Sequence, residues 1–118
     1  MRVGIDTVEI ARIEKSLGIP GFLERVYSQK EICFLKAKNS ALSLQSYAAN
    51  FAAKEAFSKA LGTGVRGFSL NEVSILRDEL GAPYIELSGR AKEAAKELRF
   101  TVSLTHTATD ATAIVIAY

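Results

Sequence analysis

The sequence predicts an α+β fold, in which a mainly antiparallel sheet packs with a long central helix in a single domain. Helical patterns fill the first half of the chain, whereas pairs of β-rich runs joined by polar turns fill the second half. A doubly wound parallel sheet would need strands and helices in regular alternation, and that alternation is missing. The length of 118 residues and the 48% of hydrophobic residues suit one domain, so we expect residues 1–118 to fold as one unit.

The first half of the chain is predicted to hold one strand and three helices. Alternating apolar residues indicate a strand over residues 3–7, and apolar residues at helical spacing indicate a helix over residues 8–17. Residues 22–37 also have helical spacing, with Ser28 as a candidate cap inside that segment. Polar residues at 39, 40 and 43 then indicate a loop.

The third helix is the most strongly predicted element, because residues 44–61 are rich in alanine and contain neither glycine nor proline. The Gly-Thr-Gly run at residues 62–64 ends it. We expect the remaining elements to be strands at 70–77 and 83–87, a short helix at 88–98, and a hairpin of strands at 100–107 and 111–118.

The charge balance and the cysteine count exclude several classes of protein. The 15 basic and 13 acidic residues give a net charge of +2, which is too even for binding long nucleic acid through bulk charge and still allows a local basic patch. Cys33 is the only cysteine, so no internal disulfide can form; we expect it in the core and expect the protein in the cytoplasm. We expect no membrane segment, since no apolar run approaches the ~18–20 residues that span a bilayer.

Glu55 lies at an unexpected position on the predicted helix 44–61. On a helical wheel it falls in the middle of an apolar face that includes Tyr47 and Phe51, and Lys59 lies one turn further on. A carboxylate on such a face must be paired, bound to a metal or facing a cleft, because burial of an isolated charge is costly. The alternative is an exposed Glu55–Lys59 pair, which would contribute only about 0.3–0.5 kcal/mol.

Asp6 raises the same question on the first predicted strand. It shares a strand face with Gly4, whereas Val3 and Ile5 face the other way, and aspartate is depleted in strands. Gly4 leaves space for a close approach beside the carboxylate; the alternative is an edge or exposed face. One carboxylate on a strand and one on a helix suit Mg²⁺, which takes one or two carboxylates together with phosphate oxygens and water.

Two further segments are candidates for ligand contacts. Residues 62–64 follow the C-terminal end of a helix, so they form either a plain C-cap or a backbone beside which an extended ligand lies, with Lys54 and Lys59 nearby for phosphates. Residues 103–107 are rich in hydroxyl groups and contain the only histidine, His106, which suits hydrogen bonding to phosphate. The alternative for His106 is a structural role.

Four segments, in the right order, resemble the signatures of one enzyme family, the holo-acyl-carrier-protein synthases. Residues 4–13 resemble its N-terminal signature, and residues 51–64 closely resemble its central signature. Residues 81–84 match its Gly-x-Pro hairpin, and residues 103–107 match its C-terminal motif. The resemblance covers nearly the whole chain, and the central motif is highly specific.

This resemblance implies a phosphopantetheinyl transferase, which moves phosphopantetheine from coenzyme A to a serine of apo-acyl carrier protein in fatty acid biosynthesis. Such enzymes require Mg²⁺ and release adenosine bisphosphate. Asp6 and Glu55 match the metal ligands of the family, so both would converge on a Mg²⁺ that the coenzyme A pyrophosphate also holds. Lys59 matches the lysine that stabilises or protonates the leaving phosphate. A metal-bound water and Glu55 are both candidates for the base that accepts the serine proton.

The resemblance also implies binding residues and an assembly. Small members of the family are trimers with active sites at subunit interfaces, so we expect a homotrimer in which His106 reaches the site of a neighbouring subunit. The basic residues Arg12, Lys15 and Arg25 match the face that docks the acidic acyl carrier protein. The expected coenzyme A contacts are Lys54, Lys59, Gly62, Thr63, Gly64, Ser103, Thr105, His106 and Thr107.

The chain departs from the family pattern at two places. Residues 18–21 carry no positive charge, whereas many relatives have arginines there. Asn50 stands where many relatives carry an arginine that helps to hold a coenzyme A phosphate, and Lys36 and Lys38 are nearby candidates to replace that contact. The departures therefore affect the expected carrier and nucleotide contacts more than the expected metal ligands.

Two alternative functions compete with this reaction. A non-catalytic module that binds coenzyme A or an acidic partner would predict the loss of Asp6, Glu55 or Lys59, and all three are present. A broader transferase for peptide or polyketide carriers resembles two fused copies of this unit, and 118 residues hold only one copy.

Overall fold

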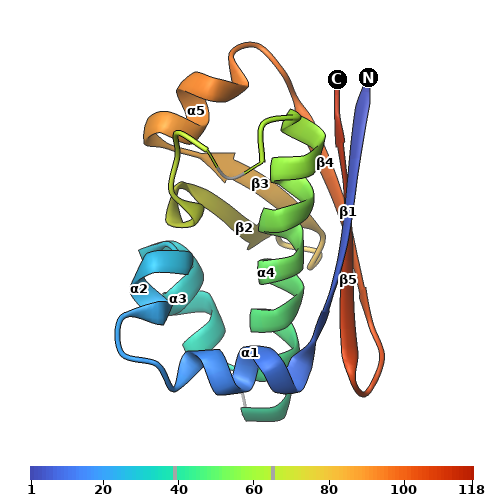
Figure 1. Cartoon of the computed structure of the whole chain (residues 1–118). Helices are drawn as coiled ribbons and strands as arrows, with labels where there is room; N and C mark the ends of the chain where they lie inside the picture. Colours follow the sequence, from blue (N-terminus) through green and yellow to red (C-terminus); the bar gives the residue numbers. More distant parts are fainter. Residues whose placement is uncertain (39, 65) are drawn as a thin grey trace.

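A long helix, α4 (Ser40–Leu61), forms the centre of the molecule and has β-structure on two sides. The computed structural model describes residues 1–38, 40–64 and 66–118. The other elements are β1 (Arg2–Glu9), α1 (Ile10–Leu17), α2 (Phe22–Val26), α3 (Gln29–Lys36), the 3₁₀ turn η1 (Leu70–Glu72), β2 (Val73–Arg77), β3 (Pro83–Leu87), α5 (Gly89–Ala95), β4 (Phe100–His106) and β5 (Asp110–Ala117). Figure 1 shows a three-stranded sheet along one side of α4, with a two-stranded hairpin and short helices, among them α2, α3 and α5, on the other. The α+β class, the central helix and the antiparallel pairing are thus confirmed.

The helix expected over residues 22–37 is in fact two helices, and Ser28 is the reason. Its hydroxyl accepts from the Glu31 amide at 3.3 Å while the Glu31 carboxylate accepts from the Ser28 amide at 2.9 Å, so a complete capping box begins α3. The extended backbone of Tyr27, with φ of −110° and ψ of 139°, separates α3 from α2. The capping pattern was therefore predicted correctly, but a cap begins a helix and cannot lie inside one.

The prediction of a loop over residues 39–43 is wrong for the residues that the structure describes. Ser40 and Ser43 lie in the first turns of α4, and Asn39 lies outside the described residues. The Ser43 hydroxyl donates to the Leu35 carbonyl oxygen at 2.9 Å. That carbonyl belongs to the last turn of α3, where helical acceptors are left free. Serine is often a sign of a loop, but the hydroxyl of Ser43 instead links α4 to the end of α3.

Two other boundaries are shorter than expected. The strand expected over residues 70–77 begins with η1, because Ser69 and Glu72 form a second capping box there. The helix expected over residues 88–98 ends at Ala95, since Lys96 has a positive φ of 54° that helical geometry does not allow. Both hairpin pairings, β2 with β3 and β4 with β5, agree with the sequence prediction.

The three-stranded sheet has the order β1-β5-β4, and its two faces differ. On the face toward α4, β5 presents the buried residues Ala111, Ala113 and Ala117, and α4 has buried alanines of its own. These small side chains allow close contact between the sheet and the helix. The opposite face presents apolar side chains to solvent: Val3 is 60% exposed and Ile5 is 56% exposed. Alternation along β5 divides the apolar run 113–117 in the same way, with Val115 buried and Ile114 exposed.

Gly4 allows β1 to approach α4 closely. A Cβ atom at this position would lie 2.6 Å from the Ala60 amide nitrogen, 2.9 Å from the Lys59 Cβ, and closer still to the Ala56 carbonyl oxygen. The sequence indicated a close approach beside Asp6, and the segment that approaches is helix α4. Gly4 therefore brings the carboxylate of Asp6 within reach of the residues on α4.

Two smaller observations complete the fold. Cys33 is exposed on α3, so its expected place in the core is wrong. It lies on the outer side of a helix whose buried residues are Glu31, Ile32 and Leu35. In the ranges that the structure covers, no helix is both long enough and apolar enough to cross a bilayer.

Candidate active site

Asp6, Glu55 and Lys59 form a polar cluster where β1 crosses α4. The Lys59 ammonium donates to the Ile5 carbonyl oxygen at 2.9 Å and lies 3.3 Å from Asp6 Oδ1. The Lys59 side chain is 56% exposed, whereas that of Asp6 is only 20% exposed. The ion pair therefore joins two elements, and the alternative of a simple surface pair between Glu55 and Lys59 does not describe this site.

The charge of Glu55 is coupled to its neighbours. Partial burial raises the pKa of the Glu55 carboxyl, and the negative charge of Asp6 raises it further, while the positive charges of Lys59 and Arg12 oppose the shift. Two carboxylates that repel each other in this way favour a proton or a cation between them. The cluster thus carries excess negative charge that the single ammonium of Lys59 does not cancel.

The donor set of this cluster fits Mg²⁺ bound together with a substrate. Asp6 and Glu55 supply hard oxygen ligands, which Mg²⁺ prefers, and it usually takes only one or two carboxylates in addition to phosphates and water. Within residues 1–38, 40–64 and 66–118, no group of three or more His, Cys, Asp or Glu side chains could enclose a metal ion. Phosphate oxygens or water would therefore have to complete the coordination.

The segment after α4 is open beside Lys59. Gly62 and Gly64 have positive φ values of 87° and 65°, and no atom lies within 4 Å of the position that a Cβ would take at Gly64. The Gly62 amide donates to the Ser58 carbonyl at 3.2 Å, which is a normal helix end. Gly62 therefore forms a plain C-cap of α4, which was one of the two alternatives for this segment. Thr63 and Gly64 have an exposed backbone along which a ligand can lie.

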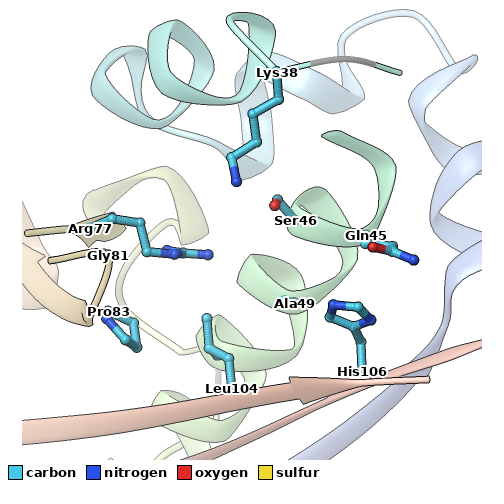
Figure 2. Close-up of a pocket in the computed structure, with 9 residues that line it drawn as sticks. All are labelled: Lys38, Gln45, Ser46, Ala49, Arg77, Gly81, Pro83, Leu104 and His106. Atoms are coloured by element: carbon cyan, nitrogen blue, oxygen red, sulfur yellow. The ribbon is translucent and has the colours of Figure 1, made fainter. Parts of the chain in front are cut away.

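A second candidate site is a pocket of about 260 Å³ (Figure 2). Lys38, Arg77 and His106 point into it from three different segments, after α3, at the end of β2 and at the end of β4. Lys38 was one of two candidates to replace a missing phosphate contact; the other, Lys36, is exposed and does not line the pocket. The lining residues, none of which is acidic, are Lys38, Gln45, Ser46, Ala49, Arg77, Gly81, Pro83, Leu104 and His106.

The structure divides the predicted contact segment 103–107. Leu104 and His106 lie on the α4 side of β4, whereas Ser103 and Thr105 are exposed on the opposite face. The Thr107 hydroxyl accepts from the Asp110 amide at 3.0 Å and so stabilises the turn between β4 and β5. Of this segment, only Leu104 and His106 line the pocket.

The pocket and the carboxylate cluster adjoin opposite edges of the three-stranded sheet. Asp6 belongs to β1 and His106 to β4, which are the two outer strands of the sheet, with β5 between them. Within one chain, the structure therefore does not bring His106 next to Asp6, Glu55 and Lys59.

Lys54 is not at either site. Its side chain is fully buried and forms an ion pair with the Glu31 carboxylate at 2.6 Å. The same ammonium donates to the carbonyl oxygens of Leu70, at 3.1 Å, and of Val73. With no exposed surface and three acceptors around its ammonium, Lys54 cannot reach a phosphate in this conformation. The expected coenzyme A contact of Lys54 is corrected to a structural role.

Arg77 is the residue that sequence reasoning missed. Its Nη2 donates to the Asn50 side-chain oxygen at 2.8 Å, and burial lowers the pKa of its guanidinium, a shift that the charge of Glu31 opposes. The available signal was a cation on a strand directly opposite Pro83, inside a segment already identified as a hairpin motif. Local pattern alone did not show that this strand end faces a pocket.

The three expected docking residues are all exposed on the first two helices. Arg12 and Lys15 lie on α1, and Arg25 lies on α2. Arg12 is close enough to Glu55 to influence its pKa, so this basic surface adjoins the carboxylate cluster. Arg25 Nη1 donates to the Pro20 carbonyl at 3.5 Å, which brings a positive charge beside the uncharged segment 18–21.

Comparison with known proteins gives a consistent result. Residues 2–114 match the family model of the 4'-phosphopantetheinyl transferase superfamily. Holo-[acyl-carrier-protein] synthase from Treponema denticola is 43% identical over 117 residues, which cover 97% of this chain and 94% of that protein. The crystal structure of the Helicobacter pylori holo-[acyl-carrier-protein] synthase in complex with coenzyme A is 38% identical, with a TM-score of 0.84 over 98% of this chain and 99% of that one. The corresponding Neisseria meningitidis structure is 30% identical, with a TM-score of 0.86 over 99% and 97%.

Proposed function

The chain belongs to the 4'-phosphopantetheinyl transferase superfamily, and on that premise we propose that it transfers phosphopantetheine from coenzyme A to a serine of apo-acyl carrier protein. The observation that carries this proposal is the cluster of Asp6, Glu55 and Lys59, which presents two coupled carboxylates and an exposed ammonium on one surface. We assign the transferase domain to residues 1–118.

The reaction exchanges one phosphorus–oxygen bond for another. The serine oxygen attacks the phosphorus that carries the pantetheine, the bond to the second phosphate breaks, and adenosine 3',5'-bisphosphate leaves. The serine loses its proton, for which the Glu55 carboxylate and a water molecule are the candidate acceptors. Lys59 has the exposure and the charge to stabilise the leaving phosphate.

Asp6 and Glu55 are the residues that would hold Mg²⁺. When bound, the ion would neutralise charge on the pyrophosphate oxygens during the attack. Both side chains lie on supports with little freedom, because Asp6 is in a paired strand and Glu55 is in the middle of α4. This arrangement would keep the carboxylates in position before the substrate arrives.

The Lys38–Arg77–His106 pocket is proposed to bind the adenosine end of coenzyme A for a neighbouring copy of the chain. The pocket adjoins β4 and the carboxylate cluster adjoins β1, at the two edges of the three-stranded sheet, so one extended substrate is proposed to use the pocket of one copy and the cluster of the next. We propose a homotrimer. The exposed apolar face of the sheet, with Val3 opposite Ile116 and Ile5 opposite Ile114, supports self-association through that surface.

The acidic carrier protein is proposed to dock on Arg12, Lys15 and Arg25, next to the carboxylate cluster. The setting that follows from this reaction is fatty acid biosynthesis, and a cytoplasmic location remains the prediction from the single cysteine.

Mass spectrometry of apo-acyl carrier protein, incubated with the enzyme, coenzyme A and Mg²⁺, tests the reaction directly. We expect a mass gain of one phosphopantetheine, no gain with EDTA, and a near-complete loss of transfer in Glu55→Gln. The matched control is Glu93→Gln, an exposed carboxylate on α5 away from both sites, which should transfer normally. Coenzyme A binding without any mass gain would contradict the transferase and favour a non-catalytic module.

Light scattering tests the assembly. We expect the mass of three chains for the wild type and a smaller assembly for Ile5→Lys, which places a charge on the exposed face of β1. A wild-type mass of one chain would contradict the trimer and the shared site.

A further inference from the structure

We propose that Asn50 is a positioning residue that holds the Arg77 guanidinium in the pocket, where Arg77 recognises the 3'-phosphate of coenzyme A. This inference rests on the proposed function, and it identifies which residues of the pocket set the preference for the phosphorylated nucleotide. It is carried by a chain of buried hydrogen bonds that ends at the pocket wall.

The pocket has the charge of an anion site. Lys38, Arg77 and His106 are its ionisable lining residues, and no carboxylate accompanies them. Coenzyme A carries a pyrophosphate and a separate phosphate monoester on its ribose. Asp6, Glu55 and Lys59 already account for the pyrophosphate in the proposed reaction. The remaining phosphate is the monoester, and its dianion suits a guanidinium better than a neutral donor does.

Arg77 is held in one orientation by contacts on two sides. Its Nη2 donates to Asn50 Oδ1 at 2.8 Å, and the guanidinium carbon lies 5.6 Å from the centre of the Phe34 ring. Lys38 lies 4.9 Å from the centre of the same ring, so the aromatic side chain contacts both cations. Figure 2 shows both side chains directed into the pocket. Nη1 donates to the carbonyl oxygens of Ile75 and Leu76, both at 3.4 Å, so Nε and the second N–H of Nη2 are the groups available to a ligand.

Asn50 itself cannot turn. Its side chain is fully buried, and its Nδ2 group donates to Glu31 Oε2 and to the Ile75 carbonyl oxygen, both at 3.0 Å. Both donors of the amide are therefore used, and the oxygen has to face Arg77. A rotated amide would oppose its own N–H groups to the guanidinium and would remove the donor from Glu31 Oε2.

The amide is in turn supported by a buried ion pair. Glu31 Oε1 accepts from Lys54 Nζ at 2.6 Å and from the Ser28 amide at 2.9 Å, while its other oxygen accepts from Asn50. The series Lys54–Glu31–Asn50–Arg77 thus runs from the core to the pocket. The neutral amide suits this fully buried point, since a second guanidinium here would lie beside Arg77.

The test compares coenzyme A with 3'-dephospho-coenzyme A as substrates of the wild type, Arg77→Gln, Asn50→Ala and the double variant. For Arg77→Gln we expect the ratio of kcat/KM values for the two substrates to fall about 10- to 100-fold. For Asn50→Ala we expect a fall of about 3- to 10-fold through KM for coenzyme A, with kcat retained. In the Arg77→Gln background, Asn50→Ala should lower the ratio no further, because its effect passes through Arg77. Arg90→Gln, an exposed charge on α5, is the matched control and should keep the wild-type ratio.

Two results would overturn the proposal. One is an unchanged ratio in Arg77→Gln while the wild type transfers normally from coenzyme A. The other is an Asn50→Ala variant that loses activity equally with both substrates, which would make Asn50 merely structural. If Asn50→Ala does not fold, Arg77→Lys replaces it, since a lysine keeps the charge but not the planar fork toward Asn50. A fall in the ratio for Arg77→Lys supports the proposal, and an unchanged ratio overturns it.

Calorimetry separates this inference from the proposed function. Adenosine 3',5'-bisphosphate should bind the wild type more tightly than 5'-ADP, and Arg77→Gln should abolish that difference. If the wild type transfers from neither substrate, the proposed function fails, and the two nucleotide affinities then decide the inference alone. Equal affinity of the wild type for both nucleotides would overturn it.

Discussion

Lys54 and Lys59 lie five residues apart on the same helix, yet their ion pairs differ in burial, in distance and in the number of additional hydrogen-bond partners. The Lys54 side chain is 0% exposed and lies 2.6 Å from an equally buried Glu31, whereas Lys59 is 56% exposed and lies 3.3 Å from Asp6. The buried pair has additional backbone and amide partners that complete its hydrogen bonds. The open pair leaves part of its charge facing solvent. A closed ion pair can only support the fold, while an open one can still bind a substrate.

The largest effect expected from this comparison is on stability. Lys54→Met should lower the free energy of unfolding by about 3–5 kcal/mol, because it leaves the Glu31 carboxylate buried without its counter-charge. Lys59→Met should change it by less than about 1 kcal/mol, as for other exposed pairs. Urea unfolding measures both values. Adding Glu31→Gln to Lys54→Met should recover part of the loss, and equal costs for the two lysine variants would contradict the distinction.

The second effect is on the rate of the reaction, and here the open pair of Asp6 and Lys59 is the one that matters. Asp6→Asn and Lys59→Gln should each reduce phosphopantetheine transfer by about 10²–10³-fold, because the first removes a carboxylate that would hold Mg²⁺ and the second removes the cation that stabilises the leaving phosphate. Neither should lower the unfolding midpoint appreciably, since the Lys59 side chain is 56% exposed and water replaces much of the interaction. Initial rates at saturating Mg²⁺ provide the measurement. A variant with near-normal turnover would remove that residue from the site.

The third effect concerns the basic surface beside the open pair. Arg12→Glu should raise KM for the acidic carrier protein on the order of tenfold and leave KM for coenzyme A unchanged, because a surface charge acts mainly on partner association. Added salt should reduce the difference from the wild type. Steady-state kinetics with each substrate varied in turn make the comparison. Equal changes for both substrates, or none, would rule out Arg12 as a docking residue.

The smallest effect sharpens the comparison, because it concerns the half-buried charge of Glu72, which stabilises the fold. Hydrogen bonds from the backbone amides of Ser69 and Arg90 hold the pKa of the Glu72 carboxyl below its usual value. A depressed carboxyl pKa stabilises the fold above the unfolded value of about 4.3 and loses that contribution as the pH falls through the folded pKa. Glu72→Gln should therefore lower the Tm at pH 7 by a few degrees.

This difference between Glu72→Gln and the wild type should shrink as the medium is made more acidic than the ordinary carboxyl range. Thermal unfolding followed by circular dichroism across pH measures it, with the exposed Glu93→Gln as the control. A difference in Tm that stays constant with pH would show that shape, and not charge, stabilises this turn.

Much of the fold followed from local pattern. The alanine-rich helix, the two hairpins and the capping residues Ser28 and Glu31 all follow from short-range rules of spacing and hydrogen bonding. The errors fell where a local signal had a long-range use. Ser43 binds a carbonyl of another helix, and Cys33 lies on the outer side of α3.

The sequence by itself determined the family, most of the elements, and the unusual placement of Asp6 beside Gly4 on a strand and of Glu55 on an apolar helix face. Only the tertiary structure decided which lysine is buried and which is open, and it alone showed Arg77 at the pocket. Periodicity defines the side of a helix on which a residue lies, but not what covers that side. Glu31 is 23 residues from Lys54 in the chain, and Asp6 is 53 residues from Lys59. Burial, hydrogen bonding and pKa depend on such distant partners, so they are properties of the packed elements and not of any local stretch of sequence.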